Sequence, residues 1–447
     1  MLRKIQYFCL VGSVGLVGAD RIDLLAGHGP FTLTPFLVLA LLVVSVHLLR
    51  MGSQQVFELA VTPPLRRQVP FVAASSLFLL CAFVSVPLGL EPSRGVVAFC
   101  DLLIVAVLGY FISTRILAEP EQGRLIVISV TFGLVVYVIF CIGEYIAWSH
   151  GLVMDAQRSG PWLETTFTPS TLGPWVPCFS GTTYDSNRSG FVLTMYLVLL
   201  DRFAIKTRYT RLLQLAIALL VFLSFSRSGV LCWLAYYLFS NSFWKSLATR
   251  RVLIRVAAIA VVTSVLCVVY QKEIVGLAEA WEISDAVATK LSMAEGTSGE
   301  SHVLLIQRGL KTWLTSTKTV VTGIGYAAAP KVLEDFFGTD KHGNFHSLYV
   351  TALAEIGLPA FVLIIFLLGY PIVGRKGTLP CMAAIMIFNV SYQTHTEPMF
   401  WLALALSWSY ERRQRLGWFR SLLQAVIPLR GQQSRLCHDC AAKNPVR

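Results

Sequence analysis

The sequence predicts an all-α fold: a polytopic membrane protein with about twelve transmembrane helices of roughly 20 residues each. Of its 447 residues, 55% are hydrophobic and only 14% are charged, and the mean hydropathy is +0.64, whereas soluble domains carry roughly 25% charged residues. Stretches such as Phe36 to Leu49 and Leu125 to Ala147 are apolar on every side and lack the single apolar stripe of a soluble surface helix. Lipid is therefore the expected surrounding of these segments.

The first of these segments, Ile5 to Val17, is expected to be a span and not a signal peptide, because no small-residue cleavage site and soluble body follow it. Segments 211–226 and 229–244 are short, so hydropathy alone leaves open whether they form two spans or one. All predicted spans lie near residues 5–18, 31–49, 69–89, 95–113, 125–148, 189–205, 211–226, 229–244, 252–271, 347–369, 378–393 and 397–411.

The basic residues decide the orientation. When segments 211–226 and 229–244 count as two spans and the N-terminus is cytoplasmic, most of the 37 Lys and Arg fall in cytoplasmic loops, as the positive-inside rule requires. Both termini are then cytoplasmic, and the protein lies in the bacterial inner membrane. The net charge of +12 follows largely from this topology, so no nucleic-acid partner is expected.

Two predicted periplasmic loops are long, and long loops in compact proteins are usually functional or disordered. The larger is expected to be partly helical, because apolar residues recur at helical spacing between His302 and Leu314. The predicted organisation is helices 1–5 in residues 1–148, a periplasmic loop at 149–188, helices 6–9 in 189–271, a large periplasmic loop at 272–346, helices 10–12 in 347–411, and a basic cytoplasmic tail at 412–447.

Cysteine and histidine spacing gives little reason to expect a metal. Most of the ten cysteines lie within or beside predicted spans, so no disulfide framework is implied. Cys437 and Cys440 form a CxxC in the tail, but a zinc site usually needs a second pair. His342 and His346 are four residues apart, yet the Gly-Asn pair between them favours a turn. We therefore expect no metal and no other cofactor.

Four ionisable residues are expected on the periplasmic face. Arg188 stands at the entry of the sixth span, Arg227 lies between two apolar stretches, Arg308 lies on the predicted loop helix, and His346 opens the tenth span. An ionisable group at membrane depth is energetically unfavourable and is by default a candidate functional residue.

Each of these residues also has a purely structural interpretation. Arg188 and Arg227 would be explained as helix-end side chains that extend to the interface, Arg308 as a solvated loop charge, and His346 as a helix cap. Glu355, further along the tenth span, would serve equally well as a hydrogen bond between helices. The functional interpretation depends on the convergence of these residues on one face.

Three arginines on one outer face, with few compensating acids beside two of them, predict a site for a concentrated anion such as a diphosphate. The planar guanidinium donates two parallel hydrogen bonds and stays charged when desolvated. Because nucleotide-activated donors are not available outside the cytoplasm, a transferase there needs a lipid-linked donor, such as a polyprenyl diphosphate glycan. The arginines would offset the charge on the departing diphosphate, and a neutral histidine would accept the proton of the acceptor hydroxyl.

These motifs resemble the O-antigen ligase and O-antigen polymerase superfamily of bacterial membrane proteins. The resemblance runs from about residue 180 to 370 and includes the order of the motifs and the large loop between the ninth and tenth spans. The residues that carry it are Asp185-Ser-Asn-Arg188, Ser226-Arg-Ser-Gly229, Arg308 with Trp313 and Thr322-Gly-Ile-Gly325, and Asn344-Phe-His-Ser-Leu-Tyr349 with Glu355-Ile-Gly357.

The resemblance implies an enzyme similar to C-type glycosyltransferases, which acts on undecaprenyl diphosphate glycans without a metal. By position, Arg188, Arg227 and Arg308 would bind the diphosphate, and His346 with Arg227 would be catalytic. Ser347 follows His346 where the family more often has Asn, which affects the expected positioning of the acceptor more than donor binding. The residues expected to support this site are Asp185, Asn187, Asn344 and Glu355.

The resemblance leaves the acceptor open. It is lipid A core in an O-antigen ligase of lipopolysaccharide biosynthesis, a growing glycan in a polymerase of O-antigen or exopolysaccharide, and a protein in a protein O-oligosaccharyltransferase. We favour a ligase or polymerase. A glycolipid or anion transporter or flippase is the competing class, because twelve spans with both ends inside are also typical of transporters. No internal repeat relates the two halves of the sequence, which argues against transport.

Overall fold

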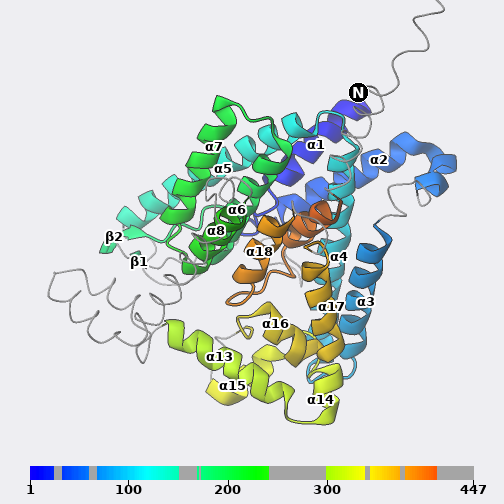
Figure 1. Cartoon of the computed structure of the whole chain (residues 1–447), viewed down its shortest axis with the longest axis vertical. Coiled ribbons are helices and arrows are strands. Elements are labelled where there is room, and N and C mark those ends of the chain that lie inside the picture. Colours follow the sequence, from blue (N-terminus) through cyan, green and yellow to red (C-terminus); the bar gives the residue numbers. More distant parts are fainter. Residues whose placement is uncertain are drawn as a thin grey trace, which may run out of the picture.

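The computed structural model describes residues 1–24, 33–59, 68–150, 169–170, 173–240, 298–337, 343–372 and 378–409. Within these ranges the protein is mostly helical (Figure 1). The predicted ninth span at 252–271, the basic tail at 412–447 with Cys437 and Cys440, and His342 lie outside the described residues.

The N-terminal part consists of helices that match the predicted spans in order. α1 packs against both α2 and α5, and α2 and α4 extend beyond their predicted ends. Pro70 and Pro92 stand in the first turn of α3 and α4, where a missing backbone N–H leaves no intrahelical bond unmade. The helices are α1 (Leu2–Gly15), α2 (Pro35–Leu59), α3 (Val69–Ser85), α4 (Pro92–Ala118) and α5 (Gln122–Ser149).

A small antiparallel strand pair, β1 (Pro169–Ser170) and β2 (Gly173–Pro177), follows α5. It is an exception to the predicted all-α fold. Pro169 lies opposite Pro177, and the pair contacts the rest of the fold through α5.

The two short apolar segments form two separate helices. α6 (Ser186–Phe203) and α8 (Arg227–Phe239) run parallel, because Gly190 meets Gly229 at one end and Tyr236 Oη donates to Asp201 Oδ2 at 2.7 Å at the other. α7 (Arg208–Leu223) connects the C-terminus of α6 to the N-terminus of α8. The chain turns between α7 and α8 at Phe225, whose φ is 52°. The segments 211–226 and 229–244 are therefore not merged into one helix.

The predicted loop helix is confirmed as α13 (Ser298–Trp313), which carries Arg308. Two shorter helices follow, α14 (Thr317–Thr322) and α15 (Ala329–Phe337). Figure 1 shows these three helices together at one end of the molecule, beside α16.

The prediction of one continuous helix at 347–369 is wrong. The segment is divided into α16 (Leu348–Thr351), a π-helical turn, η2 (Ala352–Ile356), and α17 (Leu358–Gly369). The break falls at Gly357, whose φ is 101°. A Cβ atom there would lie 2.1 Å from the carbonyl oxygen of Val321, so the close approach of the α14 backbone requires glycine.

The C-terminal described part forms the centre of the bundle. α18 (Leu379–Phe388) is followed by a loop at 389–397 and by an apolar helix, Pro398–Ser409. Trp401 in that last helix is only 1% exposed, and every residue from Met399 to Trp408 is buried. A glycine lets α4 approach this last helix closely. A Cβ atom on Gly109 of α4 would lie only 2.9 Å from Cβ of Trp401.

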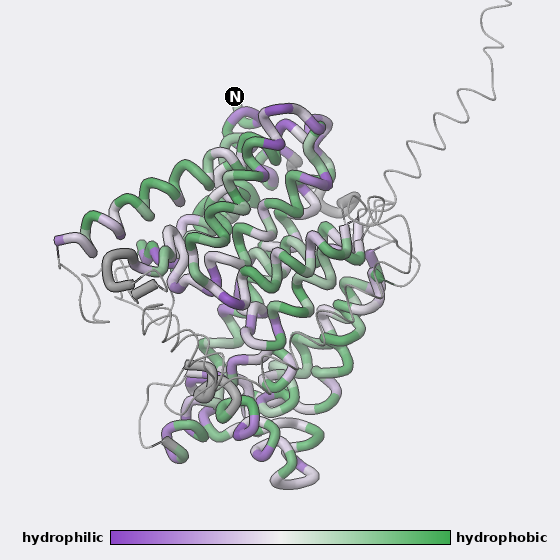
Figure 2. Tube along the Cα trace, turned by 60° about the vertical axis from the view of Figure 1, so that its left-hand side comes forward, coloured by the Kyte–Doolittle hydropathy of each residue, from purple (hydrophilic) through white to green (hydrophobic). Residues whose placement is uncertain are grey.

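The apolar character extends to the outer surface. Figure 2 shows hydrophobic positions along most of the helical trace, and large apolar side chains such as Val135, Ile139 and Ile142 of α5 are exposed. By length and composition, Pro92–Ala118 and Gln122–Ser149 are able to cross a membrane. The number of crossings and the periplasmic placement of the loops stay predictions.

Candidate functional site

The motifs around Arg188 and Arg227 form one structural unit. Asp185 caps α6, because its Oδ1 accepts hydrogen bonds from the backbone N–H groups of Asn187 at 2.7 Å and Arg188 at 2.9 Å. Ser226 caps α8 in the same way, through the N–H of Gly229 at 2.9 Å. The Asn187 side chain joins the two caps, since its Oδ1 accepts from the hydroxyls of Ser226 and Ser228 at 2.8 and 3.0 Å.

A glycine crossing holds these two helix N-termini together. A Cβ atom on Gly190 would lie 2.5 Å from Cα of Gly229, so any larger residue would separate the helices. Arg188 and Arg227 each stand two residues before their glycine. The Ser-Gly pairs that follow the two arginines are therefore the reason that the motifs meet.

Arg188 lies among acids. Its side chain is 28% exposed, its Nε lies 2.9 Å from Glu397 Oε1 and 4.0 Å from Asp185 Oδ2, and its Nη1 contacts Asp20 Oδ2. Nε also donates to the Tyr392 hydroxyl at 3.0 Å, and that hydroxyl donates to Asp185 Oδ2 at 2.5 Å. Burial raises the pKa of the Asp20 carboxyl, although Arg188 opposes the shift.

His346 joins this network through Tyr392. The two rings are roughly perpendicular, with centroids 6.4 Å apart. The backbone of His346 has a φ of 52°, a conformation that few residues with a side chain adopt, and its N–H donates to Asn344 Oδ1 at 2.8 Å. Asn344 thus stabilises the turn that presents His346. Strained backbone of this kind is concentrated at functional sites.

Ser347, the departure from the family pattern, has a buried structural contact. Its hydroxyl donates to the carbonyl oxygen of Asn389 at 3.3 Å, and the next N–H, of Leu348, donates to the carbonyl of Tyr392 at 2.9 Å. These bonds connect the start of α16 to the loop that carries Tyr392. Ser347 therefore positions the partner of His346.

Arg308 lies on α13, next to the glycine at which this helix packs against Phe345 and α16. Its guanidinium carbon is 4.6 Å from the centre of the Phe336 ring on α15. The next residue, Gly309, packs against Phe345 and Val350, where an added Cβ would lie 2.4 to 2.9 Å from their side chains. The Arg308 Nε is buried and has no hydrogen-bond partner among the described residues. Such an unsatisfied charged donor indicates a binding role more than a structural one.

Glu355 has a structural role within the described residues. Its carboxylate is buried and accepts hydrogen bonds from the N–H groups of Ala327 and Ala329, both at 3.0 Å. It therefore fixes the beginning of α15, the helix whose Phe336 lies under Arg308. A structural hydrogen bond of this kind was the alternative that the sequence allowed for Glu355, beside direct support of the site.

The sequence did not reveal Asp20, Tyr392 and Glu397 as site residues. Asp20 also accepts from the N–H of Tyr184 at 2.8 Å, which connects the end of α1 to the loop before α6. Asp20 and Glu397 could have been noticed in the sequence, because each is an acid next to a long apolar stretch. Tyr392 lies in no recognised motif.

A buried ion pair supports the same loop. Arg21 Nη1 donates to Glu144 Oε1 at 2.5 Å and to the carbonyl oxygen of Gly181 at 2.8 Å, and Glu144 Oε2 accepts from the N–H groups of Ser180 and Gly181. The pair thus connects α1, α5 and the approach to Arg188. In the part of the chain that the structure describes, no group of three His, Cys, Asp or Glu is arranged to hold a metal.

Comparison with protein families defines the class of this protein. Residues 212–365 match the family model described as O-antigen ligase. The match includes Arg227, Arg308, His346 and Glu355, whereas Arg188 precedes it. Among curated proteins, none matches the chain significantly.

The family match supports the O-antigen ligase and polymerase superfamily that the sequence motifs predict, and it covers residues 212–365 of the 447 residues. The described residues are mostly helical, and the family match supports a polytopic membrane protein with a glycosyltransferase-like ligase or polymerase function. The family implies, in general, a lipid-linked glycan and an acceptor as substrates.

Proposed function

We propose that the protein transfers a glycan from undecaprenyl diphosphate to an acceptor hydroxyl, as an O-antigen ligase or a surface-polysaccharide polymerase. One observation carries this proposal. Separate sequence motifs meet in one contact network, which leads from the serines beside Arg227 through Asn187 and Arg188 to Tyr392 and His346. A histidine that this network joins to the helix end at which Arg227 stands is suited to transfer from a diphosphate.

Arg227 and Arg308 are the best candidates for binding the donor diphosphate. Arg227 begins α8, and the dipole of that helix favours an anion at its N-terminus. Arg308 has a buried Nε for which the described residues supply no acceptor. A diphosphate would supply that acceptor and would gain charge-assisted hydrogen bonds.

The proposed reaction is a displacement at the anomeric carbon of the donor glycan. The acceptor oxygen forms the new bond, the bond to the diphosphate oxygen breaks, and undecaprenyl diphosphate leaves with the bonding electrons. His346 accepts the proton of the acceptor hydroxyl. Arg227 and Arg308 stabilise the negative charge that develops on the leaving group.

Arg188 has a different role in this proposal from the one that its sequence motif implies. Its guanidinium already has Asp20, Asp185 and Glu397 as neighbours, and a diphosphate that approached it would be repelled by these acids. Arg188 is therefore a positioning residue that holds Tyr392 against His346, with Asp185 as the second support.

The proposed topology has twelve spans, both termini in the cytoplasm and the site on the periplasmic side of the inner membrane. The charge distribution of α6 supports it. Arg188 and its acids lie at the N-terminus of α6, whereas Arg202 and Lys206 lie at the other end with Arg208 of α7. Basic residues beyond one end of the helix are expected in the cytoplasm.

Protein O-glycosylation and transport of a glycolipid are the other candidate functions. Protein O-glycosylation uses the same donor, so only the acceptor separates it from ligation and polymerisation. For transport, a polar site near the middle of the bundle is expected, but the network here is built on helix N-termini and loops. That arrangement favours transfer.

The test uses cells in which the variants Arg227→Ala and His346→Ala replace the native protein. We expect surface glycan to be lost while undecaprenyl-linked glycan accumulates on the periplasmic leaflet. Arg124→Ala, which changes an exposed arginine of α5, is the matched control and should retain surface glycan. Normal surface glycan in both site variants would contradict the proposal, and donor trapped on the cytoplasmic leaflet would indicate a flippase.

A conservative variant tests the contact that Arg227 makes. Arg227→Lys keeps the charge but loses the planar pair of donors, so transfer should fall about tenfold or more. Normal transfer by this variant would mean that Arg227 only anchors the helix end. Reconstitution with defined donor and either lipid A core or a second repeat unit identifies the acceptor.

A further inference from the structure

A second cationic site lies at the opposite end of α1 from Asp20. It is a cavity of about 220 Å³ between the N-terminus of α1 and parts of α2 and α4. Since α1 has 14 residues, the cavity and Asp20 are separated by about 20 Å of helix. The polar side chains that line it are Arg3, Gln6, Tyr7, Arg50, Arg115 and Glu119.

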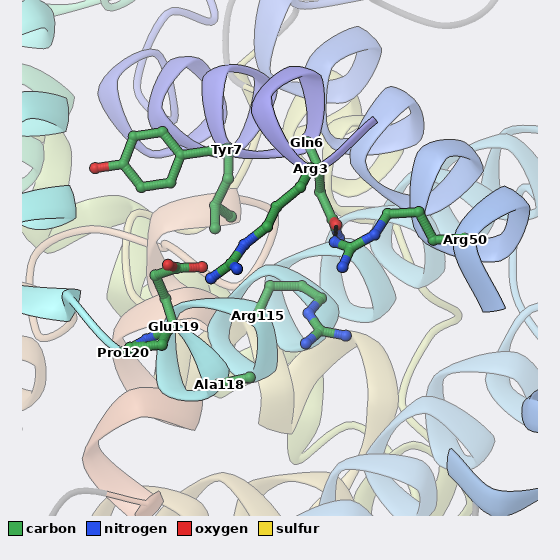
Figure 3. Close-up of a pocket in the computed structure, with 9 residues that line it drawn as sticks. Arg3, Gln6, Tyr7, Arg50, Arg115, Ala118, Glu119 and Pro120 are labelled. Atoms are coloured by element: carbon green, nitrogen blue, oxygen red, sulfur yellow. Dashed lines mark hydrogen bonds between the residues drawn. The ribbon is translucent and has the colours of Figure 1, made fainter. Parts of the chain in front are cut away.

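Two of the three arginines of this cavity have neutral hydrogen-bond partners. Arg50 Nη1 donates to Gln6 Oε1, and Arg115 Nη1 lies 2.9 Å from Nε2 of His47. In Figure 3 the ends of Arg50 and Arg115 point toward each other, and Arg3 extends toward Glu119. Among the described residues, none of these arginines forms an ion pair with a carboxylate.

An anion would relieve the repulsion within this cluster. Three guanidinium groups from three separate helices face a space that contains one carboxylate, so the lining has an excess of positive charge. Like charges at short range destabilise the fold unless a counter-charge binds between them. Guanidinium groups that converge from different directions suit the several oxygens of a phosphate.

The surroundings of the cavity indicate that the phosphate belongs to a lipid. Phe8 of α1 and Leu49 of α2 are 75% and 72% exposed beside the residues that line it, so acyl chains would find apolar contacts next to the phosphate. On the proposed topology this end of α1 faces the cytoplasmic leaflet, where anionic lipids attract basic residues and fill basic pockets between helices.

We propose that the cavity between α1, α2 and α4 binds the phosphate of an anionic glycerophospholipid. The bound lipid connects three helices, α1, α2 and α4, at this end. From the cavity, α1 leads to the segment that contains Asp20 and Arg21. These two residues form hydrogen bonds with the loop before Arg188. The lipid therefore stabilises the helix that supports the candidate site.

The test compares lipid binding by the purified full-length protein and its variants. Native mass spectrometry with mixed micelles of phosphatidylglycerol and phosphatidylcholine should reveal selective retention of phosphatidylglycerol. The variant Arg50→Gln/Arg115→Gln should lower the affinity for phosphatidylglycerol about tenfold, because two charge-assisted contacts are lost. Arg124→Gln, an exposed arginine outside the cavity, is the matched control and should bind as the unaltered protein does.

Two further measurements separate the outcomes. Inorganic phosphate should neither displace phosphatidylglycerol nor raise the melting temperature; displacement would assign the site to a soluble phosphate and overturn the lipid proposal. The single variant Arg50→Gln changes only one exposed side chain of α2 and should fold, so its affinity is measured even if the double variant is unstable. Equal retention of the two lipids by the unaltered protein, or unchanged affinity in Arg50→Gln, would overturn the proposal.

Discussion

At the scale of single residues, the surroundings of Arg188 determine what this arginine is able to do. One guanidinium faces the carboxylates of Asp20, Asp185 and Glu397, and burial raises the pKa of Asp20. The three carboxylates outnumber the one guanidinium, so the cluster disfavours binding of an anion. Tyr392 belongs to this cluster and also contacts His346.

Tyr392→Phe separates positioning from binding. The variant keeps the ring beside His346 but removes the hydroxyl that joins Arg188 to Asp185. Loss of a hydrogen bond to charged groups is worth about 1.5 to 3 kcal/mol, so transfer should fall about tenfold to a hundredfold while the protein level stays normal. Transfer from defined lipid-linked donor in proteoliposomes gives the rate.

Tyr349→Phe is the matched control for that measurement. It removes a hydroxyl that donates to the carbonyl oxygen of Met386 at 2.9 Å, a bond to the backbone of α18 away from Arg188. This variant should transfer glycan at nearly the normal rate. Equal rates for Tyr392→Phe and Tyr349→Phe would contradict the positioning role.

His395 gives a prediction on pH. This buried loop residue contacts the Tyr326 hydroxyl through Nε2 at 3.3 Å, and burial lowers its pKa to about 4. Since the folded pKa lies below the unfolded value of about 6.5, the neutral ring stabilises the fold at neutral pH, and that contribution is lost as the pH falls from about 6.5 toward 4.

Melting temperatures of the unaltered protein and His395→Gln, measured across this pH range, test the prediction. Because glutamine does not titrate, the stability advantage of the unaltered protein should shrink as the pH falls. A constant difference between the two proteins would mean that His395 does not gain a proton on unfolding.

At the scale of secondary-structure elements, the crossing of α6 and α8 is the central feature. Gly190→Val would place side-chain atoms where Cα of Gly229 lies, so we expect a loss of about 1 to 3 kcal/mol of stability and a loss of transfer. Gly143→Ala on exposed α5 is the control, because nothing lies within 4 Å of its added Cβ. Thermal unfolding and transfer assays compare the two, and an unaffected Gly190→Val protein would exclude a tight crossing.

Most helices were predictable from the sequence, because an apolar run of sufficient length has few alternatives to a helix. The break at Gly357 was missed, since the residues on both sides are apolar and hydropathy does not register a π-helical turn. The local signal was Gly357-Leu-Pro359, in which proline occupies the first turn of a new helix.

The candidate site was only partly predictable. Arg188, Arg227 and His346 lie in short motifs, and the structure brings those motifs into one network. The contact of Asp20 with Arg188 joins residues 168 positions apart, and that of Tyr392 with Asp185 joins residues 207 apart. No local pattern encodes such contacts, because they depend on how the helices pack.

At the scale of the whole molecule, the two cationic sites are expected on opposite sides of the membrane. Lys206 follows α6 at the end far from Arg188, and Lys331 lies on α15, the helix whose Phe336 contacts Arg308. Both lysine side chains are exposed. A membrane-impermeant maleimide should therefore label Lys331→Cys in cells with a permeabilised outer membrane, and Lys206→Cys only after the inner membrane is opened. The described native cysteines are buried or half-buried, and the parent protein gives the background. Labelling of Lys206→Cys in cells with an intact inner membrane would reverse the topology and would place the diphosphate site where nucleotide-activated donors are available.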